Sequence, residues 1–258
     1  KIRINPGNIG GDDRVKAVAT VCREKKIPIR IGVNSGSVEK SILAKYGAPT
    51  AEALCESALY HASLLEKSDF TDIVISLKSS SVDTNIKAYE RIAERCDYPL
   101  HVGVTEAGLP GQGTIKSAIG IGALLAEGIG NTIRVSLTGD PVPEAKAAWD
   151  ILRALNLRTH GVQLVSCPTC GRTCIDVAGI AARVEKELSD IQVPLKVAVM
   201  GCVVNGPGEA READIGMAGG KRGGVLFVKG QEPMVVEENL ADRLIELARK
   251  IAAEKAGK

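Results

Sequence analysis

Short apolar runs alternate with amphipathic stretches over the first 156 residues. Runs rich in β-branched residues stand at 1–5, 28–34, 72–80, 100–108 and 132–140. The stretches between them repeat apolar residues at helical spacing, at 12–26, 50–68, 82–96, 114–128 and 143–156. This alternation is typical of parallel strands joined by crossover helices, so the predicted class is α/β.

One charged residue stands in or just after each of these apolar runs. These residues are Arg3, Arg30, Lys78, Glu106 and Arg134. Three of their four spacings match one strand–helix unit, and the longest gap has room for an extra short helix at 37–47. Because the carboxyl ends of parallel strands converge in a barrel, the repeat favours a barrel with one shared site.

Five strand–helix units are fewer than a closed (β/α)8 barrel needs. Either the barrel is incomplete, or the sheet is open and doubly wound. Lys1 leads directly into an apolar strand with no initiator methionine before it. We therefore expect a partial TIM-type barrel over residues 1–158, in the C-terminal portion of a longer protein whose first barrel units are absent here.

The pattern changes after Gly161. Strands are predicted at 162–166, 193–201 and 223–230, and helices at about 176–191 and 236–254. A turn that contains cysteines follows the first of these strands, and a glycine-rich segment follows the second. Residues 159–258 are thus predicted to form a smaller α+β domain.

The overall composition limits the classes of binding partner that are expected. Hydrophobic residues make up 45% of the chain and charged residues 25%, with a formal net charge of +2. This balance argues against a surface that coats nucleic acid and favours a small partner. No run reaches the roughly 18 apolar residues of a membrane span, and no signal-peptide pattern is visible, so we expect a soluble cytoplasmic protein.

Three cysteines follow predicted strands. Cys167 and Cys170 form a C-x-x-C turn, and Cys202 directly follows the strand at 193–201. Thiolates at this spacing can share a metal centre that a distant third thiolate completes. A redox dithiol normally opens a helix in a thioredoxin-like domain, and a zinc ribbon needs a second C-x-x-C pair, neither of which is visible. A [4Fe–4S] cluster and a zinc knuckle both stay open.

A [4Fe–4S] cluster would need a fourth ligand, for which Cys174 and Glu209 are candidates. Four thiolates would favour an electron relay. A carboxylate is harder and more weakly held, so it can yield to substrate at one iron. Glu209 would therefore indicate a catalytic cluster.

The basic residues of the first region indicate an anion site. Arg3, Arg30, Lys78 and Arg134 are enough to hold a diphosphate through charge-assisted hydrogen bonds, unless they form ion pairs inside the barrel. Glu106 is the one acid of the set, and it would act as a general acid or base or balance the basic group.

Several motifs together resemble one family. They are RINPGNIG at 3–10, RIGVNSGS at 30–37, TEAG at 105–108, SAIGIGALLAEGIGNTIRVSLTGDPVPE at 117–144, CPTCGRT at 167–173 and GCVVNGPGEA at 201–210. They resemble the bacterial hydroxymethylbutenyl diphosphate synthase family (IspG/GcpE) of the methylerythritol phosphate (MEP) pathway, over essentially the whole chain.

The resemblance implies a fold and a reaction. Members of this family have a (β/α)8 barrel followed by a domain similar to sulfite and nitrite reductases. They open the ring of 2-C-methyl-D-erythritol 2,4-cyclodiphosphate reductively, giving 4-hydroxy-3-methylbut-2-enyl diphosphate and water. Ferredoxin or flavodoxin supplies the electrons, and the family works as a homodimer.

The resemblance also implies roles for single residues. The ligands of the [4Fe–4S] cluster would be Cys167, Cys170, Cys202 and Glu209, with Asn205 beside the same iron. Substrate contacts would fall on Arg3, Arg30, Asn34, Lys78, Thr105, Arg134 and Ser136. Glu106 would be a proton donor or an electrostatic partner. The alternative from another class is a zinc-stabilised phosphate-binding protein without redox activity.

Overall fold

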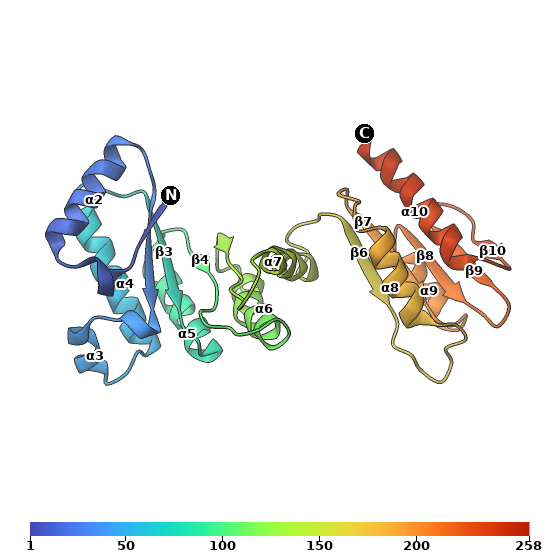
Figure 1. The fold of residues 1–258 in the computed structure, drawn as a ribbon, viewed down its shortest axis with the longest axis horizontal. Coiled ribbons are helices and arrows are strands. Elements are labelled where there is room, and N and C mark those ends of the chain that lie inside the picture. The colour runs from blue at the N-terminus through green and yellow to red at the C-terminus, as the bar shows by residue number, and fades with distance from the viewer. Residues whose placement is uncertain (258) are drawn as a thin grey trace. The chain divides into compact units, whose positions relative to one another are not determined.

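The computed structural model describes residues 1–257 (Figure 1). They divide into two compact units, Lys1–Leu157 and a second unit that begins at Arg158. Among the described residues, no helix is long and apolar enough to cross a lipid bilayer.

Unit 1 repeats strands and helices in the predicted order. Its elements are β1 (Ile2–Ile4), α1 (Pro6–Ile9), α2 (Asp12–Glu24), β2 (Ile29–Asn34), the 3-10 helix η1 (Ser35–Ser37), α3 (Lys40–Tyr46), α4 (Ala51–Glu66), β3 (Ile73–Lys78), α5 (Val82–Ala93), β4 (His101–Val102), α6 (Gln112–Ala126), β5 (Thr132–Ile133) and α7 (Val142–Ala154). The α/β class is confirmed, and α3 occupies the gap that had room for a helix. The last two strands are much shorter than predicted.

The strands of unit 1 run parallel. β1, β2 and β3 form one sheet, and β4 pairs with β5. An isolated parallel bridge between Ile75 and Leu100 joins the two groups. Within residues 1–257 these strands do not close into a barrel.

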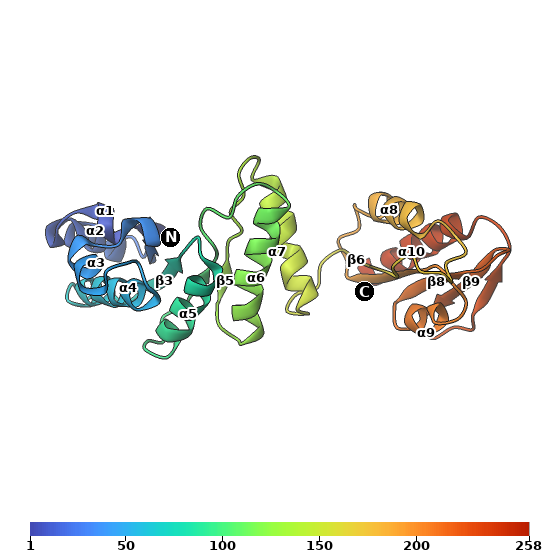
Figure 2. The ribbon, with the colours of Figure 1, turned by 90° about the horizontal axis from the view of Figure 1, so that it is seen from below.

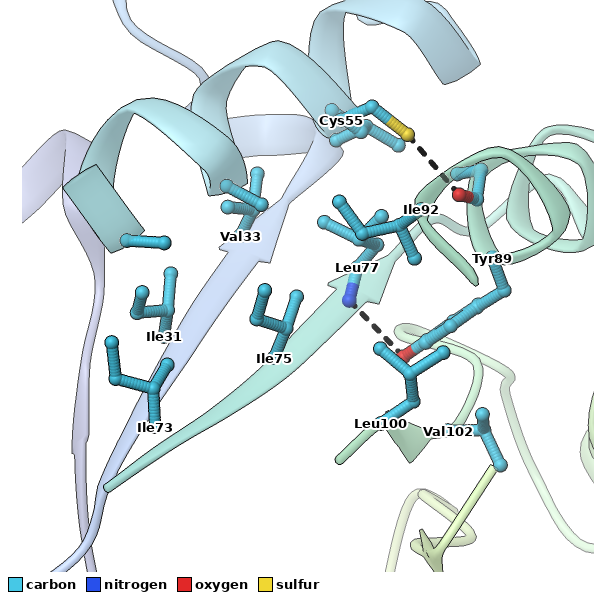
Figure 3. Close-up of a cluster of buried hydrophobic side chains, with 14 of the residues drawn as sticks. Ile31, Val33, Cys55, Ile73, Ile75, Leu77, Tyr89, Ile92, Leu100 and Val102 are labelled. Atoms are coloured by element: carbon cyan, nitrogen blue, oxygen red, sulfur yellow. Dashed lines mark hydrogen bonds between the residues drawn. The ribbon is translucent and has the colours of Figure 1, made fainter. Parts of the chain in front are cut away.

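The hydrophobic core of unit 1 lies on one face of the strands. Alternate residues of β2 and β3, such as Ile31 and Ile75, are completely buried and point toward α4 and α5 (Figure 3). Apolar residues of α2, α6 and α7 join the same cluster. A doubly wound sheet would have a core on each face, so the single core favours an arc of a barrel. Because strand side chains alternate between faces, Arg30 and Lys78 lie on the opposite face.

Unit 2 is a five-stranded sheet with helices on both faces. Its elements are β6 (Val162–Ser166), α8 (Val177–Glu187), β7 (Leu195–Met200), α9 (Gly206–Arg211), β8 (Ile215–Gly219), β9 (Gly224–Val228), β10 (Met234–Val236) and α10 (Leu240–Ala256). The sheet order is β10-β9-β8-β7-β6, parallel from β6 to β8 and antiparallel from β8 to β10. Helices α8 and α10 cover one face and α9 the other (Figure 2).

Three elements of unit 2 were not predicted, namely α9, β8 and β10. α9 and β8 lie in the glycine-rich segment, where helix and strand propensities are weak, and β10 is only three residues long. Gly216 explains why glycine is needed inside β8, because a Cβ there would lie 2.6 Å from the carbonyl oxygen of Ala210 in the adjacent α9 segment. The glycines thus permit close packing of helix on strand.

Candidate functional site

The cysteines of unit 2 lie in two loops at one edge of the sheet. Strands β6 and β7 are parallel neighbours, with Ser166 opposite Val199, so the loops that follow them leave the same edge. The backbone N–H of Gly201 donates a hydrogen bond to Cys167 Sγ at 3.2 Å. The N–H of Cys174 donates to the carbonyl oxygen of Gly201 at 2.8 Å. These bonds tie the C-x-x-C loop to the loop that carries Cys202.

Backbone N–H groups favour the thiolate form of two of these cysteines. At Cys170, N–H of Arg172 is the main cause of a lowered pKa, and the Thr173 hydroxyl adds to it. At Cys202, N–H groups of Asn205, Val204 and Gly206 lower the pKa. Cys202 is buried and Cys170 is exposed. A thiolate is the form that binds metal, so both loops suit metal ligation.

The predicted cluster ligands share an edge without forming a closed ligand set. Over residues 1–257, no three His, Cys, Asp or Glu side chains lie close enough together to hold a metal ion. Glu209, in the first turn of α9, is exposed, as is Asn205 at the N-terminal end of that helix. The donor chemistry does fit an iron–sulfur cluster, because such clusters use thiolates supported by N–H groups. The assignment of the ligands stays a prediction.

The structure gives Cys174 a local role. Its thiol donates to the carbonyl oxygen of Arg172 at 3.3 Å, and its N–H joins the two loops. The C-x-x-C turn does not open a helix, because α8 begins only at Val177. This arrangement differs from that of a thioredoxin-like dithiol.

Four cationic residues gather on the open face of unit 1. Arg3 of β1 lies directly opposite Arg30 of β2, and Lys78 ends β3 opposite Asn34. The Arg3 guanidinium donates to the carbonyl oxygen of Gly32 at 2.9 Å, and Arg30 donates to Ser76 Oγ at 3.0 Å. Within the described chain, none of Arg3, Arg30, Lys78 and Arg134 forms an ion pair with a carboxylate. The alternative of internal ion pairs is therefore not observed.

Burial and mutual repulsion act on these cations. Lys78 is 6% exposed, and burial is the main cause that lowers its pKa to about 7, followed by Arg30, Arg134 and Arg3. Burial, and then Arg3, also lowers the pKa of Arg30, while Tyr89 opposes the shift. A group of unpaired cations attracts anions strongly, so this face fits a phosphate-rich ligand.

The remaining predicted contacts lie in the segments after β4 and β5. The N–H of Thr105 donates to the carbonyl oxygen of Ser79 at 3.3 Å, and that of Arg134 donates to Val102 at 2.9 Å. Glu106 is exposed and has a φ of 52°, in the left-handed region that non-glycine residues rarely adopt. Ser136 is half-buried. A strained backbone conformation such as that of Glu106 is often found in functional loops.

Sequence reasoning missed His101, which lies within the electrostatic reach of the basic group. Its Nδ1 lies 2.8 Å from Thr132 Oγ1. Burial, and then Lys78 and Arg30, lower the pKa of His101 to about 3, so the imidazole is neutral at physiological pH. Strand alternation could have predicted this position. Val102 points into the core, so His101 beside it must lie on the opposite face, with the cations.

Both units match models of one family. Residues 1–149 match the GcpE TIM-barrel domain, and residues 163–250 match the GcpE protein C-terminal domain. The chain is also similar to proteins named 4-hydroxy-3-methylbut-2-en-1-yl diphosphate synthase (flavodoxin). It is 61% identical to the one from Clostridium perfringens, over 97% of this chain and 72% of that protein. It is 57% identical to the one from Symbiobacterium thermophilum, over 98% of this chain and 69% of that protein.

A third relative with the same name, from Caldanaerobacter subterraneus, is 60% identical over 98% of this chain and 72% of its own length. The family predicted from the motifs is thereby confirmed. Since family models match both units and relatives are 57% to 61% identical over nearly all of this sequence, the chain belongs to the GcpE family.

Proposed function

We propose that this chain is an iron–sulfur oxidoreductase, a 4-hydroxy-3-methylbut-2-en-1-yl diphosphate synthase of the MEP pathway of isoprenoid synthesis. Its substrate is 2-C-methyl-D-erythritol 2,4-cyclodiphosphate, whose ring it opens reductively with loss of water. The observation that carries the proposal is the group of four cations without carboxylate partners on one face of unit 1, which suits a cyclic diphosphate. The names of these relatives, which include flavodoxin, support flavodoxin as the electron donor.

The redox half of the proposal rests on the two cysteine loops. Cys167, Cys170 and Cys202 would hold a [4Fe–4S] cluster, with Glu209 as the fourth ligand. The cluster would pass on, one at a time, the two electrons that the reduced donor protein supplies. The N–H groups directed at the sulfurs would stabilise the thiolates, and the exposed positions of Glu209 and Asn205 leave both accessible to substrate.

The residues of unit 1 bind and orient the diphosphate. Arg3, Arg30, Lys78 and Arg134 neutralise its charge, and Asn34, Thr105 and Ser136 add hydrogen bonds from polar side chains. Glu106 would donate a proton to the substrate hydroxyl that leaves as water, while the ring oxygen stays on the diphosphate. The likeness of unit 2 to sulfite and nitrite reductases, the homodimer and the cytoplasmic location stay predictions.

Anaerobic purification tests this proposal against a zinc-stabilised phosphate-binding protein. We expect a brown protein that contains iron and acid-labile sulfide and that converts the cyclic diphosphate when reduced flavodoxin is supplied. Parallel assays with reduced ferredoxin would compare the donors. A colourless protein with stoichiometric zinc and no turnover would contradict the proposal.

Glu209→Ala tests the fourth ligand. We expect the three thiolates to retain much of the iron, while turnover falls by about 100-fold or more because the weakly held ligand position is lost. Glu212→Ala is the matched control, because Glu212 is an exposed carboxylate at the other end of α9. Equal turnover in both variants would remove Glu209 from the site.

A further inference from the structure

Lys78 occupies an unusual place among the cations of unit 1. It ends β3 and is 6% exposed. A Cβ atom at Gly103 would lie 3.1 Å from its Nζ, so the side chain packs against the backbone of the segment after β4. The charged or titratable groups that act with it come from β1, β2, β4, the segment after β5 and α7: Arg3, Arg30, His101, Arg134 and Glu144.

The one acid of this set does not neutralise Lys78. Glu144 Oε1 accepts a hydrogen bond from the N–H of Leu137 at 2.8 Å, and its carboxylate raises the pKa of Lys78 only as the weakest cause. The neutral His101 adds no charge to offset the guanidinium groups. Lys78 is therefore a buried amine that faces three cations and has no carboxylate at ion-pair distance among the described residues.

Only Lys78 can relieve this repulsion by releasing a proton. Guanidinium groups keep their charge at every physiological pH, whereas a buried ammonium gives up its proton readily. The pKa of Lys78 is lowered to about 7, first by burial and then by Arg30, Arg134 and Arg3. Near neutral pH, the free site is thus a mixture of two charge states.

We propose that Lys78 takes up a proton from solvent when a diphosphate binds, so that the fourth cation of the site forms together with the complex. The proposal rests on the proposed function, because the diphosphate is the anionic group of the substrate. The negative charge of the ligand offsets the repulsion from the three neighbouring guanidinium groups, which favours the ammonium. The free protein therefore avoids the desolvation and repulsion of a fourth cation. In the complex, the Lys78 ammonium adds its positive charge to the site.

Because binding is coupled to proton uptake by Lys78, the affinity for the diphosphate must fall as the pH rises. Well below pH 7, Lys78 is protonated in both the free and bound states, so binding takes up no proton. Above pH 7 the free amine is neutral and each binding event must add a proton, which weakens binding by about tenfold per pH unit until the pKa of the complex is reached. A permanent cation at this position would show no such loss.

Calorimetry with inorganic pyrophosphate tests the proposal on the full chain. Titrations of the wild type, Lys78→Arg and Lys78→Met at pH 6 to 9, in buffers with different ionisation enthalpies, give the protons taken up. The protonation of pyrophosphate itself is common to all three proteins and cancels in the comparison. We expect the wild type to take up close to one proton more than either variant near pH 8, and to lose affinity relative to Lys78→Arg by about tenfold per unit above pH 7.

Carbon-13 NMR of labelled lysine provides a measurement on the unsubstituted protein. We expect the Lys78 resonance, assigned by its absence in Lys78→Met, to titrate near pH 7 in the free protein and at clearly higher pH with pyrophosphate. Titration near the ordinary lysine value of about 10.4 in the free protein would overturn the proposal. Pyrophosphate binding without extra proton uptake would overturn it and leave the proposed function intact, whereas no binding at any pH would overturn both.

Discussion

The Tyr89 hydroxyl joins two strands that share little else. It accepts a hydrogen bond from the N–H of Leu77 at 3.1 Å and donates one to the carbonyl oxygen of His101 at 2.7 Å. The ring is completely buried and extends from α5 toward Leu77 of β3 (Figure 3). Since β3 and β4 are otherwise joined by an isolated bridge, one side chain holds the end of β3 near the strand that carries His101.

Tyr89→Phe removes this link while keeping the ring. We expect a loss of about 2–4 kcal/mol in the free energy of unfolding, because a buried N–H and a buried carbonyl lose their partner. Urea denaturation measures the loss. Tyr98→Phe is the control, since its hydroxyl bonds to exposed Glu66 and its removal should cost below about 1 kcal/mol. Similar losses in the two variants would contradict the role given to Tyr89.

At the scale of residues, the positions of the charged side chains could be predicted from the sequence better than the contacts that they make. The recurrence of one charged residue per strand placed Arg30 and Lys78 on one face, since strand alternation follows directly from the apolar pattern. The sequence did not contain the burial of Lys78 or the partner of Arg30. Both depend on Ser76 and Gly103, which are unremarkable in the sequence and acquire their roles from tertiary packing.

At the scale of the elements, two glycines differ in how closely their surroundings pack against them. Gly103 follows β4, and a Cβ there would lie 2.5 Å from the carbonyl oxygen of Arg134 as well as 3.1 Å from Lys78 Nζ. Gly122 in α6 meets nothing within 4 Å, although it lies inside a helix. Glycine is thus required for close packing at Gly103, whereas at Gly122 a larger residue fits.

Gly103→Ala and Gly122→Ala form a matched pair. We expect Gly103→Ala to destabilise the protein by about 1–3 kcal/mol through overpacking and to weaken pyrophosphate binding, because it displaces Lys78 or the segment after β5. Gly122→Ala should stabilise it by about 0.5–1 kcal/mol, because alanine has the higher helix propensity. Thermal unfolding and a pyrophosphate titration measure both effects. An equal response of the two variants would show that the approach at Gly103 is not tight.

The elements that the sequence predicted best are those with strong periodicity. The helices at 12–24, 51–66 and 82–93 lie within a few residues of their predicted bounds. Helix α9 and strand β8 were missed because short glycine-containing segments derive their structure from neighbours rather than from pattern. The two-residue strands β4 and β5 were predicted too long for a related reason, since apolar residues continue past the point where strand pairing ends.

The whole molecule contains separate hydrophobic cores. The core of unit 1 is built from residues between Ile4 and Ile151, and the cores of unit 2 from residues between Val177 and Ala252. The predicted diphosphate contacts belong to the first unit and the predicted cluster ligands to the second. A ligand for either site should therefore stabilise one unit selectively.

Hydrogen exchange of the metal-free and iron–sulfur-loaded protein measures this selectivity. A ligand that binds only the folded unit stabilises it by about 2.7 kcal/mol at a concentration 100 times its Kd, which slows exchange through full opening by about 100-fold. We expect slowing of this size in β6, β7 and the loops at 167–176 and 201–205, which hold the cysteines. The amides of β2 and β3 in unit 1 are the internal reference and should change by less than about twofold. Equal slowing in both units would mean that they open as one cooperative body, and unchanged exchange around Cys167 and Cys202 would remove these loops from the cluster site.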